Sequence, residues 1–418
     1  MELGIYFKFI LSFGLILLAA RLGGEVFERY LKQPAVLGEI VVGIIISPFA
    51  LGGFIGDPII LNFATVQNPF GLGGEFHIME VISEIAVVTL LFVAGVETDV
   101  KFFLRYGLTG TAVAFGGVIL PFVFGFLAVM LLMPSVGILG WLFMGAALTA
   151  TSIGVTVRIL MDMGRLATKE GTTILVGAVI DDIIGIVILS VIIYATYSGG
   201  AISAAYAIKV FAIGFAVWFA LLFVGIRFSK YVSMVFLSPF KKSGTMPIFA
   251  IIIGFIIAYL VTLVDLHPVV GAYVAGLMFS ATKEREEIAH ATRPIMGFLA
   301  PFFFTYLGMQ VDLRLMVTPM AAILSAVLIV LAIIGKIIGC FIPARFLGKL
   351  NNTGALIVGV GMVPRGEVGL IIAGAGFLAG AINRDLFGAA VAVSIITTLI
   401  TPTMLKPLVN RLRQQQKD

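Results

Sequence analysis

Charged residues are scarce in this chain, and their scarcity excludes a soluble fold. Asp, Glu, Lys and Arg make up 12% of the 418 residues, whereas hydrophobic residues make up 60%. The mean hydropathy is +1.15. A soluble protein has too little interior to hide so much apolar surface. The composition therefore predicts an all-α polytopic membrane protein, in which most side chains face lipid or neighbouring helices.

Cysteine is almost absent, and a removable leader is lacking. The single cysteine, Cys340, excludes an internal disulfide, and its apolar surroundings predict inert packing. The first apolar segment follows Met1-Glu2 without a basic flank or a small-residue cleavage site, so we expect a retained helix. The sequence ends shortly after its last apolar segment, so we also expect no attached nucleotide-binding domain.

Long apolar segments are abundant. Most of them are near the roughly 17–25 residues that a membrane-spanning helix needs. The sequence predicts thirteen transmembrane helices, near 4–21, 34–51, 79–96, 109–132, 138–160, 171–197, 203–226, 246–264, 267–281, 292–310, 316–346, 353–380 and 386–408.

The basic residues predict the orientation of these helices. Most of the 27 Lys and Arg residues fall after odd-numbered segments, and the loops after even-numbered segments carry only Arg314 and Arg384. Cytoplasmic loops are enriched in basic residues, so we expect the N-terminus outside and the C-terminus inside. The net charge of +5 is then a topology signal and not a sign of nucleic-acid binding. Anionic lipid is the partner that these loops would attract.

Two halves of the sequence resemble each other. Segments 2 and 9, 3 and 10, and 5 and 12 match in order, and the ends of segments 3 and 10 face opposite sides of the membrane. Segments 1–6 and 8–13 are therefore predicted to be two six-helix inverted repeats joined by segment 7, as in alternating-access transporters. The matched positions include Pro34 and Pro268, Gly43 and Gly276, Gly95 and Gly308, and Asp99 and Asp312.

Two of the segments contain sequences that weaken a helix. Segment 5 carries Thr149-Ala150-Thr151-Ser152 followed by Gly154, and segment 12 carries Pro364-Arg365-Gly366-Glu367. Proline removes a backbone hydrogen bond, and transporters of this architecture bind ions where helices are interrupted. We therefore expect crossed, broken helices whose dipole ends are relieved by bound charge.

Three ionisable residues lie at mid-membrane depth. Asp181 and Asp182 are adjacent in one apolar segment, and Lys336 lies in another. Such groups are costly in lipid and indicate an ion or proton path. Neighbours on a helix point about 100° apart, so one aspartate can pair with Lys336 while the other faces a cavity. A carboxylate that holds either a proton or a hard alkali cation is the minimum machinery of cation/proton exchange.

Other charged residues within the segments have structural interpretations. Lys336 has a second interpretation as a salt bridge that holds helices together. For Arg365 and Glu367, stabilisation of the helix break is the favoured role. Glu39 and Glu84 lie near the ends of their segments, where packing or an interfacial position is favoured over ion binding.

Taken together, these residues resemble the second branch of the monovalent cation:proton antiporter superfamily, which includes NapA-type sodium/proton antiporters and Kef-type potassium systems. The resemblance covers nearly the whole chain. It is carried by Gln33-Pro34 through Gly38-Glu39 and Gly43, Leu90-Leu91-Phe92 through Gly95 and Glu97, Thr149-Ala150-Thr151-Ser152, Asp181-Asp182, Phe303-Phe304 with Gly308-Met309 and Asp312, Lys336, and Pro364-Arg365-Gly366-Glu367.

The resemblance implies a homodimer in a prokaryotic cell (inner) membrane. It implies a core at 109–200 and 316–418 that moves like an elevator against a dimer domain. The dimer domain would comprise helices 1–3 at 1–108 and, with the linker helix 7, helices 8–10 at 201–315.

The resemblance also assigns roles at the ion site. Asp182 would be the main ion and proton carrier, Asp181 would pair with Lys336, and Thr151 and Ser152 would lie beside the bound Na⁺. Pro364, Arg365 and Glu367 would support the site. No cofactor is implied, since the ions are substrates.

The expected function is secondary active Na⁺/H⁺ antiport that contributes to pH homeostasis. Li⁺ is an additional substrate, and the expected stoichiometry is an electrogenic two protons per cation. A K⁺/H⁺ antiporter on the same scaffold is the main alternative, and a sodium-coupled solute symporter is a weaker one. An aspartyl protease needs its aspartates on different helices, so adjacent aspartates on one helix argue against an enzyme. The sequence departs from the family pattern at Ser47, where a glycine before Pro48 is usual.

Overall fold

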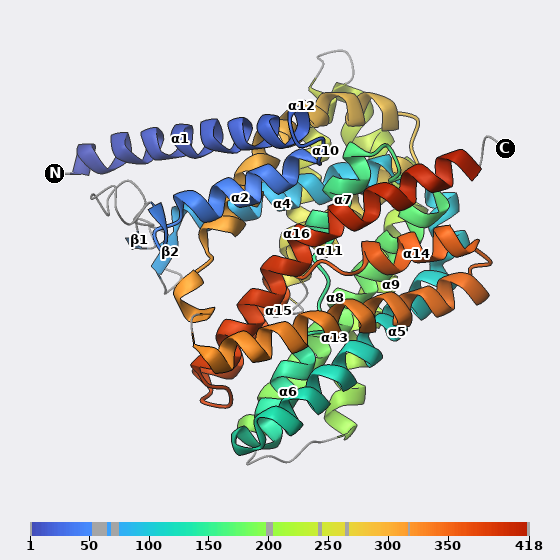
Figure 1. Ribbon diagram of the computed structural model, residues 1–418. Coiled ribbons are helices and arrows are strands. Elements are labelled where there is room, and N and C mark those ends of the chain that lie inside the picture. Colours follow the sequence, from blue (N-terminus) through green and yellow to red (C-terminus); the bar gives the residue numbers. More distant parts are fainter. Residues whose placement is uncertain are drawn as a thin grey trace. The chain divides into compact units, whose positions relative to one another are not determined.

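The computed structural model describes residues 2–51, 65–67, 75–197, 204–240, 245–263, 267–316 and 318–415. Nearly all of these residues are helical, which confirms the all-α prediction (Figure 1). The extended exception among them is one short antiparallel hairpin, in which β1 (Thr65–Gln67) pairs with β2 (Glu75–His77).

The helices follow the order of the predicted apolar segments. Each predicted segment coincides with one helix or with an interrupted pair of helices. The helices are α1 (Glu2–Arg29), α2 (Ala35–Ile46), α4 (Ile78–Glu97), α5 (Val100–Leu132), α6 (Gly137–Ala147), α7 (Ile153–Asp162), α8 (Lys169–Tyr197), α9 (Ala204–Val232), α10 (Met246–Thr262), α11 (Pro268–Ser280), α12 (Arg285–Met309), α13 (Pro319–Phe346), α14 (Asn352–Gly361), α15 (Glu367–Leu378) and α16 (Arg384–Gln415).

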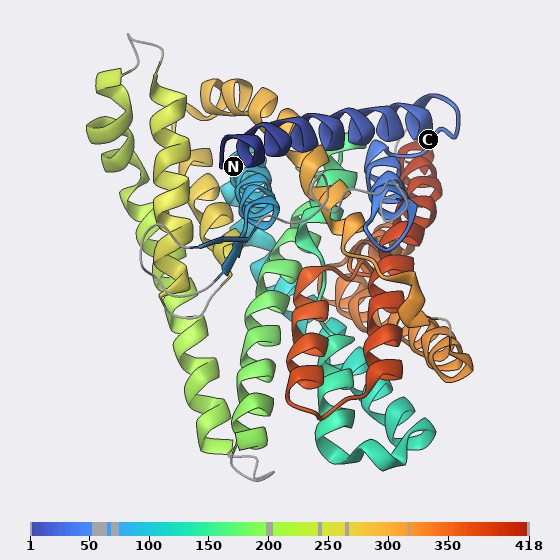
Figure 2. The same cartoon turned by 90° about the vertical axis from the view of Figure 1, so that its left-hand side faces the viewer.

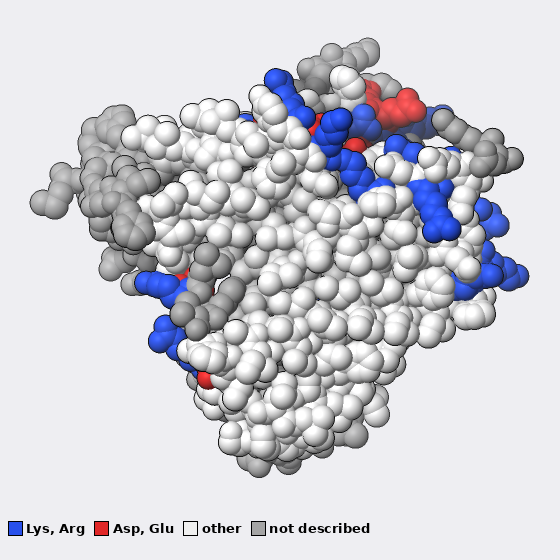
Figure 3. All heavy atoms as spheres, viewed as in Figure 1, with Lys and Arg blue, Asp and Glu red and all other residues white. Residues whose placement is uncertain are grey.

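Seven of the described helices are long and apolar enough to cross a membrane, by length and composition. Their outer faces are apolar: on α13, for example, Ile323, Ile334 and Ile342 are exposed. Figure 3 shows a broad surface without Lys, Arg, Asp or Glu. This is the surface expected of a multi-pass membrane protein whose exposed side chains face lipid. The total of thirteen spans and their orientation stay predictions.

The chain forms two compact units. The first comprises 1–90 and 291–314, and the second comprises 91–290 and 315–418. In the first unit, Ile16, Met79, Phe302, Tyr306 and Met309 form a buried apolar cluster. The second unit contains the two predicted core ranges together with 91–108 and 201–290, which were predicted for the dimer domain and linker, so the division into core and dimer domains stays a prediction. The boundary predicted at 200–201 lies outside the described residues.

Glycines allow close helix crossings within each unit, and one in each unit involves glycines that the sequence matches between the two halves. In the first unit, a methyl group added at Gly43 on α2 would overlap the Thr305 carbonyl and press on Gly308 of α12. In the second unit, a methyl group at Gly95 on α4 would overlap the Tyr273 carbonyl and press on Gly276 of α11. Small residues let helix backbones approach in this way. The sequence had matched Gly43 with Gly276 and Gly95 with Gly308, so each crossing joins one half of the predicted repeat to the other.

Two helices in the second unit are interrupted. The residues between α6 and α7 (148–152) and those between α14 and α15 (362–366) are not helical. Both interruptions fall where the sequence predicted them. Around them pack α5, α8, α13 and α16, and α15 lies beside α16 (Figures 1 and 2).

Candidate functional site

The two interruptions touch each other. The backbone N–H of Ser152 donates to the Pro364 carbonyl at 2.9 Å. The hydroxyl of Thr151 donates to the Met362 carbonyl at 3.3 Å, and that of Thr156, in the first turn of α7, donates to the Gly361 carbonyl at 2.7 Å. Each break therefore supplies donors or acceptors that the other lacks, which is how irregular backbone can be tolerated at membrane depth.

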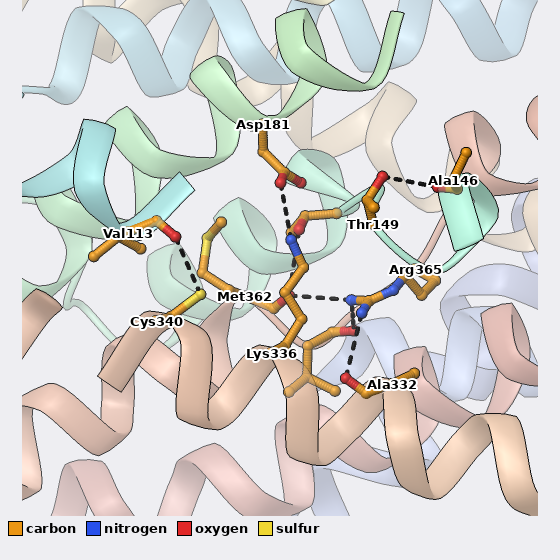
Figure 4. A network of polar contacts seen from close by, with 11 residues as sticks. Val113, Ala146, Thr149, Asp181, Ala332, Lys336, Cys340, Met362 and Arg365 are labelled. Carbon is orange, nitrogen blue, oxygen red and sulfur yellow. Dashed lines mark hydrogen bonds and ion pairs between the residues drawn. The ribbon is translucent and has the colours of Figure 1, made fainter. Parts of the chain in front are cut away.

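Arg365 holds the second interruption from within. Its side chain is 1% exposed, and Nη1 donates to the carbonyls of Val363 at 2.6 Å and Met362 at 3.3 Å. Nη2 donates to the Ala332 carbonyl on α13 at 3.4 Å (Figure 4). A cation beside the carbonyl end of α14 is stabilised by the helix dipole. Ala332 lies one turn before Lys336, so Arg365 connects the break to the helix that carries the lysine.

Helix α16 completes this support with hydroxyl groups that the sequence analysis missed. The backbone N–H of Arg365 donates to Thr397 Oγ1 at 3.2 Å. Its carbonyl accepts from Thr398 Oγ1 at 2.6 Å and from Ser394 Oγ at 3.1 Å. The sequence contains a pattern that could have indicated these hydroxyls. Four hydroxyl residues recur at helical spacing in an apolar segment, and all are buried in the structure: Ser394, Thr397, Thr398 and Thr401.

A buried ion pair lies beside the crossing. Lys336 Nζ on α13 donates to Asp181 Oδ1 on α8 at 2.9 Å, and both side chains are fully buried. Figure 4 shows the lysine side chain directed at the aspartate. The second oxygen, Asp181 Oδ2, is buried without a hydrogen-bond partner. A buried pair with an unsatisfied oxygen is weak evidence for stability, because the desolvation of both charges offsets their attraction. It is a better candidate for a functional group.

The other predicted site residues lie in the same unit. Asp182 follows on α8 and is 3% exposed. Thr151 and Ser152 lie in the first interruption, and Ser152 Oγ is buried without a hydrogen-bond partner. A methyl group at Gly366 would lie 2.6 Å from this hydroxyl, so the absence of a side chain at Gly366 keeps room around Ser152. Hydroxyl and carboxylate oxygens without partners are what a hard alkali cation would bind.

The remaining predicted residues divide as follows. Pro364 lies in the second interruption and supplies the carbonyl that Ser152 binds. Glu367 begins α15, and its side chain lies outside the described residues. Glu39 and Glu84 belong to the first unit, where Glu39 is 1% exposed and its own carbonyl accepts from Thr305 Oγ1 at 3.1 Å. Within the described part of the chain, no group of three or more His, Cys, Asp or Glu residues could hold a metal ion.

The site combines three properties that ion exchange requires. The carboxylates of Asp181 and Asp182 are buried beside the two broken helices, Lys336 binds one oxygen of Asp181, and the other oxygen of Asp181 has no hydrogen-bond partner. Because the pair is buried, its charges interact more strongly than they would in water. An arriving cation would have to displace either the lysine or a proton.

Comparison with known proteins gives consistent matches over almost the whole chain. The family model described as sodium/hydrogen exchanger, transmembrane, matches residues 11–411. The high-affinity Na⁺/H⁺ antiporter NhaS3 of Synechocystis is 34% identical over 431 residues, which cover 97% of this chain and 91% of that protein. The Na⁺/H⁺-K⁺ antiporter GerN of Bacillus cereus is 35% identical over 401 residues, which cover 96% of each.

A solved structure shares the fold. The sodium proton antiporter MjNhaP1 of Methanocaldococcus jannaschii aligns over 97% of both chains with a TM-score of 0.66. Its sequence identity to this chain is 17%, so this likeness concerns the fold alone.

Proposed function

This chain belongs to the sodium/hydrogen exchanger family, and on that premise we propose that it is a secondary active antiporter that exchanges Na⁺ for H⁺. It is a transporter and not an enzyme. The transported ions are its substrates, and no cofactor takes part.

The observation that carries the proposal is the buried Lys336–Asp181 pair beside the crossing of the two broken helices. Asp182, the next residue on α8, is the carrier that holds a proton or Na⁺ but not both. The hydroxyls of Thr151 and Ser152 and the free oxygen of Asp181 supply the remaining ligands. Pro364 and Arg365 keep the crossing in shape.

The exchange follows from displacement of the lysine. In the resting state Asp181 and Lys336 neutralise each other, and Asp182 is protonated. Entry of Na⁺ draws Asp181 away, and a buried ammonium left without its carboxylate is so costly that it releases its proton. Asp182 releases a second proton to the cation. Two protons then exchange for one Na⁺, and one net charge moves per cycle.

The architecture that accompanies this mechanism is also a proposal. Thirteen membrane-spanning helices with the N-terminus outside form two inverted repeats, as supported by the cross-matched glycine crossings. The core at 109–200 and 316–418 moves like an elevator within a homodimer. The protein would reside in a prokaryotic inner membrane, contribute to pH homeostasis and meet anionic lipid at its basic cytoplasmic loops.

K⁺/H⁺ exchange is the second candidate. Its specific support is the Bacillus cereus relative, whose name couples Na⁺/H⁺ antiport to K⁺. The same oxygen ligands would serve K⁺, and selectivity between alkali cations depends on small differences in the size of the site.

One experiment tests both candidates. Purified protein is reconstituted in liposomes with an imposed pH gradient, and dequenching of a pH-sensitive dye is followed after Na⁺, Li⁺ or K⁺ is added. Dequenching with Na⁺ and Li⁺ supports the proposal, and a response to K⁺ alone supports the second candidate. No response to any of the three cations contradicts both.

A further inference from the structure

The space around Lys336 is limited by one glycine on a neighbouring helix. A methyl group added at Gly117 of α5 would lie 3.2 Å from Lys336 Nζ and 3.3 Å from its Cδ. It would also lie 2.6 Å from Sγ of Cys340, which follows Lys336 by one helical turn. Hence the Cys340 sulfur and the Lys336 side chain together occupy the space that any other residue at position 117 would need.

The close approach of the two helices is built into both backbones. Immediately before Gly117, a methyl group at Gly116 would overlap the Gly339 carbonyl, and one at Gly339 would overlap the Gly116 carbonyl. The thiol of Cys340 closes the remaining gap by donating to the Val113 carbonyl of α5 at 3.5 Å. The lysine is thus enclosed by α5 on one side and reaches Asp181 on α8 at 2.9 Å.

We propose that Gly117 is a positioning residue for Lys336: its missing side chain keeps Lys336 Nζ within hydrogen-bond distance of Asp181 and so sets how readily Na⁺ displaces the lysine. This inference deepens the proposed function and rests on it. It is not a claim about helix packing in general, because Gly117 differs from Gly116 in what it faces. Gly116 faces backbone, whereas Gly117 faces the ends of two side chains.

The physical argument concerns the resting ion pair. Interiors are close-packed, and one methyl group added to a filled space must displace its neighbours. Backbone cannot give way easily, but a lysine side chain can. The new methyl group would therefore press on Cys340 Sγ and on the lysine, shift Nζ by a few tenths of an ångström and weaken the Lys336–Asp181 pair. Since Na⁺ has to break this pair, a weaker pair lowers the concentration of Na⁺ needed for exchange.

The test compares Gly117→Ala with Gly107→Ala. Gly107 is also on α5, and a methyl group there meets nothing within 4 Å, so it controls for the change in helix propensity. We expect Gly117→Ala to lower the KM for Na⁺ about fivefold, the lower end of what one methyl group of overpacking produces. Gly107→Ala should keep the wild-type KM. A role in packing alone would reduce the amount of folded protein and leave KM unchanged.

A double variant keeps the test decisive if Gly117→Ala does not fold. Adding Cys340→Ala removes the sulfur that the new methyl group overlaps and leaves only the contacts of 3.2 and 3.3 Å to the lysine. The double variant should fold, with a KM below that of wild type but closer to it than the single variant. A KM at or above the wild-type value in every folded variant that carries Gly117→Ala overturns the inference.

A structural measurement separates this inference from the proposed function. The structure of the folded variant, determined by electron cryomicroscopy, should show Lys336 Nζ displaced by a few tenths of an ångström and farther from Asp181 Oδ1 than the 2.9 Å of the wild type, whether or not the protein transports Na⁺. A pair that persists unchanged overturns the role of Gly117. Failure of Na⁺/H⁺ exchange in the wild-type protein would instead overturn the proposed function. It would not change the expected displacement of Lys336 Nζ in the variant.

Discussion

At the scale of single residues, the proposed exchange depends on Asp182 and on the Lys336–Asp181 pair. The resemblance to the antiporter family assigns the lysine to Asp181, and the structure shows that pair at 2.9 Å. In the proposed function, Asp182 is the residue that exchanges a proton for a cation. We therefore expect Asp182→Asn and Lys336→Gln to affect cation/proton exchange in different ways.

Asp182→Asn should abolish cation/proton exchange and leave a folded protein. Asparagine keeps the shape and one oxygen but cannot release a proton, so the proton and cation no longer share a site. The measurement is Na⁺-induced dequenching in liposomes, with size-exclusion chromatography as the control for folding. Robust Na⁺-driven proton flux in this variant would place the carrier elsewhere.

Lys336→Gln should remove the voltage response of exchange, the activity, or both. Glutamine can still donate a hydrogen bond to Asp181 but carries no transferable proton, so one proton per cycle is lost. The response to a K⁺/valinomycin potential is compared in variant and wild-type liposomes. A variant with wild-type voltage dependence would make the lysine a structural residue.

The apparent affinity for Na⁺ should fall as the pH drops. The sign follows from competition: protons occupy the carboxylate at low pH and must leave before Na⁺ binds. For one competing proton the loss approaches about tenfold per pH unit on the acid side of the transition. Binding of Na⁺ measured from pH 5 to pH 9 checks this, and an affinity that does not change with pH excludes direct competition.

At the scale of elements, the second interruption, between α14 and α15, depends on α16. The carbonyl of Arg365 accepts from two hydroxyls, those of Ser394 and Thr398, and lies in a fully buried segment. A buried carbonyl that keeps one donor loses little, whereas one that loses both bears the full cost of desolvation. Either hydroxyl alone can therefore satisfy the Arg365 carbonyl in the second interruption.

This redundancy predicts a non-additive effect on stability. Ser394→Ala or Thr398→Val alone should cost about 1 kcal/mol, whereas the double variant should cost more than the sum, by about 1–2 kcal/mol. Thermal unfolding in detergent measures the difference as a double-mutant cycle. Thr403→Val, at an exposed hydroxyl on the same helix, is the matched control. Additive effects would show that the carbonyl does not depend on these donors.

At the scale of the whole molecule, the proposed cycle moves one net charge. Such a cycle gains roughly 2.3 kcal/mol per 100 mV of membrane potential. Exchange in liposomes should therefore accelerate when a K⁺/valinomycin gradient of the favourable sign is imposed, and slow when the sign is reversed. Exchange that ignores the potential would mean one proton per cation and would refute the scheme of two protons.

The sequence by itself determined the membrane class, the interruptions and the ionisable residues. These features are local: apolar runs follow from composition, and Pro364 and Gly366 interrupt a helix wherever it packs. A carboxylate in such a run stands out because lipid offers it no partner. The resemblance to the antiporter family rests on such local motifs and therefore needs no knowledge of tertiary contacts.

Only the tertiary structure decided which side chains meet. Lys336 and Asp181 are 155 positions apart in sequence, so their spacing does not show that they meet. The family resemblance implies this pair, and the contact between the two helices shows it. Sequence spacing did not show that α16 hydroxyls hold the Arg365 carbonyl. Nor did it show that Gly117 borders the lysine, because a glycine carries no side-chain pattern of its own. Contacts of this kind depend on how helices cross, and crossing is set by packing across the whole unit.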